Sequence, residues 1–233
     1  MLSKHTMDNK NTLIIKPNSK RNGLFLLTLG LILMLICFML NLAYWHLFKL
    51  QLTALMLASF IVVLIGYFKH SEPSISYKIT PQTITYYHRR GKWQINWSDI
   101  IRVGGISSEI QGERVRLPYI GIKLTSLEPL ATTVTPRLAN KLLHEQQELC
   151  KLAVQNSQLT MAQAAIHFDG FNTKGSLLKG PVGAWLHQSK NLNLAYGYHV
   201  YLPEGSFDRD TDQFVGLLKQ CHAYSSQYTK SIE

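Results

Sequence analysis

The amino-acid sequence predicts an α+β protein in which an N-terminal two-helix transmembrane hairpin precedes an antiparallel β domain. Two long apolar runs without charge predict the hairpin, and alternating β-branched and aromatic residues beyond them predict the strands. An apolar stripe with helical spacing near the C-terminus predicts a terminal amphipathic helix. We expect a basic N-terminal segment at 1–23, the hairpin at 24–68 and the domain at 73–228.

Each apolar run is long enough to cross a bilayer. Residues 24–45 are LFLLTLGLILMLICFMLNLAYW and residues 50–68 are LQLTALMLASFIVVLIGYF, without one charged side chain. A helix rises about 1.5 Å per residue, so roughly 20 residues span a hydrocarbon core of about 30 Å. A cleaved signal peptide has a shorter apolar core, and a buried helix of a soluble protein is rarely apolar on every face. The short connection at 46–49 makes the two helices antiparallel neighbours.

Cations gather at one end of this hairpin, whereas Lys49 is the only Lys or Arg at the turn. The flanking cations are Lys4, Lys10, Lys16, Lys20 and Arg21 before it, and Lys69, Lys78, Arg89, Arg90 and Lys92 after it. The positive-inside rule therefore predicts a multi-pass protein with both termini in the cytoplasm and the turn outside. In a bacterial cell this corresponds to the inner (cytoplasmic) membrane, with the turn in the periplasm. The net charge of +10 fits this topology or anionic lipid, and no basic helical stripe indicates nucleic-acid binding.

Beyond Pro73 the pattern alternates with a period of two, which is typical of strands. A polar, Gly-containing hairpin tip is expected at 89–92. The predicted strands are residues 75–79, 83–87, 93–97 and 100–103, and a pair within 114–124 that Pro118 divides.

A helical segment follows these strands. Pro136 suits a first helical turn, and the apolar stripe Leu138, Leu142, Leu149 and Leu152 predicts one amphipathic helix. A second short helix is expected at 160–167, so the helical insertion covers about 136–167. Residues 168–183 are rich in glycine and predict a loop. Residues 196–202 predict a strand, and the terminal helix carries the stripe Phe214, Leu217, Leu218 and Cys221.

Two phrases resemble bacterial pleckstrin-homology-like domains. Residues 79–103 (ITPQTITYYHRRGKWQINWSDIIRV) resemble their opening strands, and residues 196–224 (YGYHVYLPEGSFDRDTDQFVGLLKQCHAY) resemble their last strand and C-terminal helix. Nearly the whole chain also resembles an uncharacterised family of gammaproteobacterial two-span membrane proteins, a domain of unknown function. The resemblance implies a pleckstrin-homology-like antiparallel β domain, from which the insertion at 136–167 departs, and it implies no known activity.

The basic hairpin tip is the candidate site for lipid headgroups. Arg89, Arg90, Lys92 and Trp93 are its residues. A cation within a Debye length of an anionic leaflet gains roughly 1 kcal/mol, and pleckstrin-like domains often use a strand-hairpin tip for anionic headgroups. The alternative is a solvated turn whose charges only favour solubility, with Trp93 pointing into the core.

The sequence carries no recognisable catalytic motif. His144-Glu145 lacks the second histidine of a zinc-binding helix, because position 148 is Glu. The three cysteines have no metal-ligand spacing. His167 and Asp169 could form a general acid/base pair, but no nucleophile lies in a recognisable elbow. We expect no enzymatic activity, no cofactor and no metal.

The preferred hypothesis is a membrane-anchored cytoplasmic binding or scaffolding module, whose partner is a membrane protein or an anionic lipid surface. The alternative is an enzyme that acts on a lipid or a small envelope substrate through His167 and Asp169. A pore or carrier would need several copies, because one hairpin cannot enclose a pathway, and the near absence of ionisable residues in the spans argues against it. The oligomeric state is left open.

Overall fold

The computed structural model describes residues 12–17, 22–71, 73–110, 112–173 and 175–230. The chain divides into two compact units, one formed by residues 17–74 and the other by the residues before and after them. The first contains two apolar helices and the second contains antiparallel sheets with helices, so the predicted α+β class is confirmed. Of the expected basic segment at 1–23, residues 1–11 and 18–21 lie outside the described residues.

The first unit is a helical hairpin formed by α1 (Gly23–Tyr44) and α2 (Lys49–His70). Each helix has 22 residues and is long and apolar enough to cross a membrane. Most of their large apolar side chains are exposed; Leu42, for example, is 71% exposed and Leu50 is 81% exposed. A core helix of a soluble protein buries such side chains, so this surface needs another apolar environment.

The two helices contact each other through positions spaced seven residues apart. These buried positions are Gly23, Gly30 and Cys37 on α1, and Leu52, Ser59 and Gly66 on α2. Small residues allow the backbones to approach closely, as is common between membrane helices. A Cβ atom on Gly66 would overlap the backbone nitrogen of Leu27. The Cys37 thiol and the Ser59 hydroxyl lie 3.4 Å apart.

We expect Gly66→Leu to separate the helices, because the backbone of α1 occupies the space that the new side chain needs. The control is Ala58→Leu on the exposed side of the same helix. The measurement is oxidative cross-linking between Cys37 and the cysteine of Ser59→Cys. Gly66→Leu should slow the cross-link strongly and Ala58→Leu should leave it unchanged. Equal rates in both backgrounds would contradict the close packing.

In sheet A of the second unit, the segment before the hairpin pairs with the segment after it. Its antiparallel order is β1 (Leu13–Ile15), β2 (Tyr77–Ile79), β3 (Thr83–His88) and β4 (Gly91–Asn96). Strand β1, which sequence analysis missed, precedes the hairpin, whereas β2 follows it. Ile15 pairs with Tyr77, and the Ser76 N–H donates to the Ile15 carbonyl at 2.9 Å. The hairpin is therefore an insertion between two neighbouring strands.

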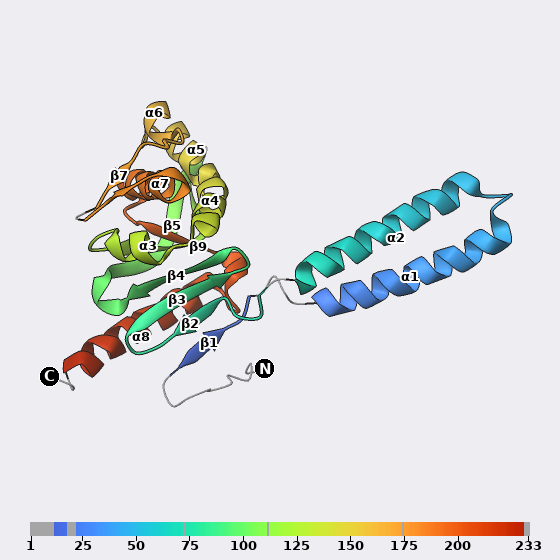
Figure 1. The fold of residues 1–233 in the computed structure, drawn as a ribbon, viewed down its shortest axis with the longest axis horizontal. Coiled ribbons are helices and arrows are strands. Elements are labelled where there is room, and N and C mark those ends of the chain that lie inside the picture. The colour runs from blue at the N-terminus through green and yellow to red at the C-terminus, as the bar shows by residue number, and fades with distance from the viewer. Residues whose placement is uncertain (1–11, 18–21, 72, 111, 174, 231–233) are drawn as a thin grey trace. The chain divides into compact units, whose positions relative to one another are not determined.

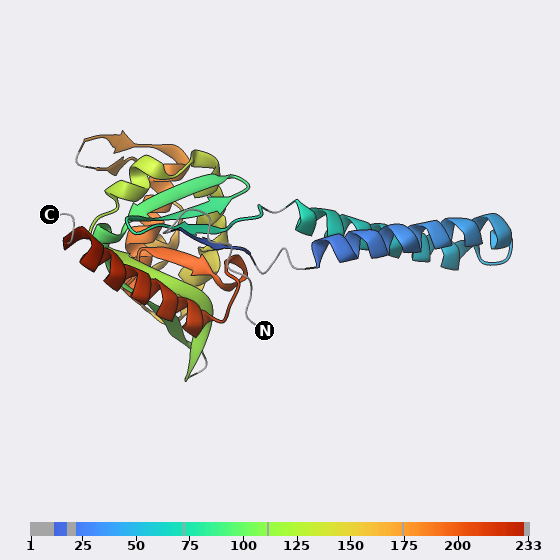
Figure 2. The ribbon, with the colours of Figure 1, turned by 90° about the horizontal axis from the view of Figure 1, so that it is seen from below.

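Sheet B contains β5 (Ile100–Ile110), β6 (Glu113–Leu124) and β9 (Val200–Pro203), all antiparallel. A 3-10 turn, η2 (Trp97–Asp99), leads into it from sheet A. The prediction of two strands divided by Pro118 is wrong, because β6 continues past this residue. The register shifts between Gly105 and Ser107 opposite Pro118, and such a bulge tolerates the missing N–H. Figure 2 shows the far end of the β5–β6 hairpin projecting beyond the domain.

A helical segment lies between β6 and β9. It contains α3 (Glu128–Thr133), α4 (Pro136–Glu145), α5 (Gln147–Gln155), α6 (Met161–Ala164) and α7 (Gly180–Tyr196), with a small β7–β8 hairpin (Phe171–Asn172 and Leu177–Leu178) before α7. The single helix predicted from the leucine stripe is broken at Gln146, whose buried side chain accepts a hydrogen bond from the Trp185 indole at 3.1 Å. The loop predicted up to residue 183 is wrong from Gly180 onward, where α7 begins.

The terminal helix α8 (Thr211–Lys230) completes the domain. A second 3-10 turn, η3 (Glu204–Ser206), precedes it. Figure 1 shows the insertion helices on one side of sheet A and α8 on the other. Phe214 is fully buried, stacks on Phe207 at 4.5 Å between ring centroids and lies 5.6 Å from Tyr77. This cluster extends through both sheets to α4 and α7, so the helical segment is part of the main core.

Candidate functional site

The basic tip is the two-residue turn between β3 and β4. His88 pairs with Gly91 across the turn, which places Arg89 and Arg90 at its end. Both arginines and Lys92 are exposed. Among the described residues, none of the three forms a salt bridge. The cations are therefore available to an anionic ligand.

The turn is held in place from the helical segment. The Thr135 hydroxyl, just before α4, donates to the Arg90 carbonyl at 3.0 Å. The Arg90 N–H donates to Nδ1 of His88 at 3.1 Å. Gly91 has a φ of 141°, and a Cβ there would overlap the Thr135 hydroxyl. Only glycine fits this position. The two hydrogen bonds hold the backbone of the turn that carries Arg89 and Arg90.

Trp93 does not belong to this surface. It is 1% exposed and its ring lies 5.5 Å from that of Tyr86 in the core. Successive side chains of a strand point to opposite faces, so the alternation that exposes Lys92 buries Trp93. The structure therefore removes Trp93 from the headgroup candidates Arg89, Arg90, Lys92 and Trp93.

Arg137 is a cation that sequence analysis missed. It is exposed in the first turn of α4, two residues after Thr135. Since Thr135 contacts the backbone of the tip, α4 brings Arg137 to the same region. No acidic residue occupies the first turn of α4, and the positive end of a helix dipole favours anions there. Only a tertiary contact between residues 45 positions apart identifies Arg137 as part of the site, and no local sequence pattern shows such a contact.

His167 and Asp169, the residues of the acid/base hypothesis, lie between α6 and β7. The His167 ring donates through Nε2 to the Ala162 carbonyl at 2.6 Å, and Asp169 is exposed. Within the described part of the chain these two side chains form no hydrogen bond with each other. His144 and Glu145 lie on the exposed face of α4, where Glu145 pairs with Lys141. No group of three or more metal-ligating side chains occurs among the described residues.

We expect His199 to make the stability of the domain depend on pH. Burial, and then the charge of Lys123, lowers the pKa of His199 from its ordinary value of 6.5, and its Nδ1 accepts the Leu124 N–H at 3.1 Å. The folded state therefore disfavours the protonated ring, and the unfolded state takes up a proton more readily. The stability that the neutral His199 ring contributes is complete above about pH 6.5 and is lost as the pH falls below that value.

We expect His199→Asn, whose side-chain oxygen can accept the same N–H, to weaken this loss between pH 7 and pH 5. The measurement is urea unfolding at several pH values. The same pH slope in both proteins would show that His199 is not the group that titrates.

The domain matches a known protein family. A family model described as a protein of unknown function (DUF2982) matches residues 77–224, which is more than half of the chain. The match runs from the first residue of β2 into α8 and includes the basic tip. No curated protein and no solved structure matches the chain.

Proposed function

Because the chain belongs to the DUF2982 family, whose function is unknown, we propose its function from the chemistry of its two units. We propose that it is a non-catalytic binding module that the hairpin anchors in a bacterial inner membrane. Its ligand is an anionic lipid headgroup, bound at the basic tip formed by Arg89, Arg90, Lys92 and Arg137. The observation that carries the proposal is this set of exposed cations, unpaired among the described residues, on a rigid turn.

The exposed surface of the hairpin supports the anchor. Both helices keep large apolar side chains exposed along their length, and lipid tails are the environment that such a surface prefers. The strands that flank the hairpin pair with each other. A hairpin that spans the bilayer therefore has both ends on the same side as the domain. Lys16 and Lys69 flank those ends, which supports the cytoplasmic side under the positive-inside rule.

The order of the elements supports a pleckstrin-like domain. A four-stranded antiparallel sheet, a three-stranded antiparallel sheet and one C-terminal helix follow each other. The β3–β4 turn is a strand-hairpin tip, the place where domains of this kind often hold anionic headgroups. The helical segment between β6 and β9 is an addition to that plan, and through Thr135 it braces the tip.

The test replaces Arg89, Arg90 and Lys92 together by glutamine in the full chain, reconstituted into nanodiscs and mixed with anionic or neutral vesicles. Each cation contributes roughly 1 kcal/mol at an anionic surface, so the triple variant should bind anionic vesicles about 100-fold more weakly. The matched control replaces Lys179, Lys190 and Lys219, three exposed lysines elsewhere, and so changes the net charge equally. Equal loss in both variants would show that only net charge matters, and salt-insensitive binding would exclude headgroup recognition.

A further inference from the structure

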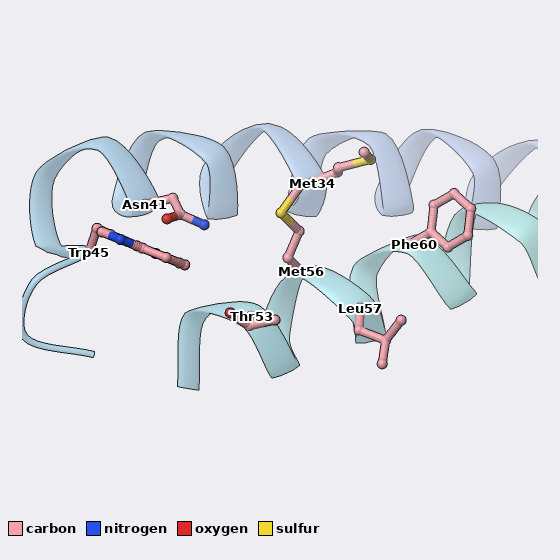
Figure 3. Close-up of a pocket in the computed structure, with 7 residues that line it drawn as sticks. All are labelled: Met34, Asn41, Trp45, Thr53, Met56, Leu57 and Phe60. Atoms are coloured by element: carbon pink, nitrogen blue, oxygen red, sulfur yellow. The ribbon is translucent and has the colours of Figure 1, made fainter. Parts of the chain in front are cut away.

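A groove lies between α1 and α2 in the half of the hairpin near the turn. Its volume is about 520 Å³, within the range of small-molecule sites. Figure 3 shows Met56 extending from α2 toward Met34 on α1, and Asn41 of α1 and Trp45, just after that helix, projecting into the same space. Thr53, Leu57 and Phe60 complete the lining from α2.

The glycines of the helix interface lie outside the groove. Gly23, Gly30 and Gly66 allow the helices to approach closely in the opposite half, whereas longer side chains line the groove near the turn. Met34 and Met56 are unbranched and adapt to irregular partners. An elongated apolar molecule can therefore fill this groove.

The surface that lines the groove is almost entirely apolar, and the few residues that carry polar groups lie nearer the turn. Met34, Met56, Leu57 and Phe60 form an apolar trough, and Asn41, Trp45 and Thr53 add polar groups nearer the turn. Lys49 stands four residues before Thr53, on the same face of α2, and its carbonyl accepts the Thr53 hydroxyl at 2.8 Å. An apolar trough with a lysine one helical turn beyond its end matches a hydrocarbon chain attached to a phosphate.

We propose that this groove binds one acyl chain of a phospholipid, whose phosphate pairs with Lys49. The inference rests on the hairpin spanning a bilayer, as in the proposed function. A second copy of the chain fits less well, because contacts between membrane helices favour small residues and the buried small residues of α1 and α2 already face each other within one hairpin.

The test uses the full chain in nanodiscs of phosphatidylglycerol and phosphatidylcholine that contain a phospholipid with a photoreactive group in its acyl chain. Mass spectrometry locates the cross-links. Labelling of Met34 and Met56 should exceed that of Leu35, an exposed residue outside the groove, by about tenfold, which corresponds to ~1.4 kcal/mol of preference.

Two matched pairs of variants sharpen the test. Thr53→Phe fills the groove and should reduce its labelling to the level of Leu35. Thr28→Phe makes the same change at another exposed threonine bonded to its own helix and should leave the labelling intact. Lys49→Gln should abolish any preference for phosphatidylglycerol, whereas Lys69→Gln at the other end should preserve it.

Uniform labelling of the helices, or cross-links that join two copies, would overturn the groove proposal while the anchor stands. A protein that stays in the supernatant and never enters nanodiscs would overturn the anchor as well, so the two failures are distinguishable.

Discussion

A soluble, folded domain is expected when the hairpin is cut out and Lys16 is joined to Ser76 through Asn-Gly. Ile15 and Tyr77 are already paired in register, and the Ser76 N–H already bonds the Ile15 carbonyl. A short turn can therefore replace residues 17–75 without moving either strand. The exposed apolar surface of α1 and α2 leaves with them, so the product should remain in solution without detergent.

A fragment that simply begins at Ile75 should behave differently, although it contains the whole family match. It lacks β1, and Ile15 of that strand is 0% exposed in the main core. Loss of a buried isoleucine side chain alone costs about 2–5 kcal/mol, a large part of a typical total of 5–15 kcal/mol. The fragment should unfold at lower urea concentration than the joined domain, or aggregate through the new edge at β2.

Circular dichroism during urea unfolding measures this difference, and a matched pair of variants controls it. Ile15→Ala in the joined domain should cost stability as a core truncation does, whereas Ile14→Ala, at a half-buried position on the other face of β1, should cost less. Equal stability of the joined domain and the fragment would show that β1 contributes nothing to the fold.

The sequence predicted the elements whose signals are local. The hairpin follows from hydropathy and length, and the β3–β4 turn follows from alternation around a glycine. The C-terminal helix follows from its apolar stripe, in which Phe214 and Leu218 are fully buried. In each case a short window of residues carries enough information to specify the element.

The elements that sequence analysis missed are a strand stabilised by a distant partner and a helix that is buried in the core on several faces. Strand β1 has three residues and is stabilised by β2, about sixty positions later. Helix α7 is buried at five consecutive positions, 182–186, so no polar face marks a helical period. Its opening Gly-Pro-Val-Gly is typical of a loop, although proline is also favoured in the first turn of a helix.

The candidate site was also predictable only in its local part. Exposure of Arg89, Arg90 and Lys92 follows from their place at a hairpin tip, and the burial of Trp93 follows from its alternation with Lys92. Arg137 could not be found in this way, because only folding brings α4 beside the tip. The local part of a surface site can be predicted from sequence, whereas the part that tertiary contacts add cannot.

Helix α7 offers the sharpest remaining prediction, because two leucines two residues apart have opposite environments. Leu192 is 0% exposed and Leu194 is 62% exposed. Leu192 packs with Tyr201, whose hydroxyl donates to the Leu192 carbonyl at 2.9 Å. Leu192→Ala should therefore destabilise the domain by about 2–5 kcal/mol, whereas Leu194→Ala should change its stability by no more than about 0.5 kcal/mol.

Urea unfolding of the joined domain, followed by tryptophan fluorescence, measures both values. Trp93, Trp97 and Trp185 are all buried in the joined domain, so their combined emission reports on the loss of its core packing. If α7 were instead the loop that its first residues suggest, the two leucines would be equivalent and the two substitutions would have similar, small effects. The difference between them thus tests whether the helical segment is part of the core that supports the basic tip.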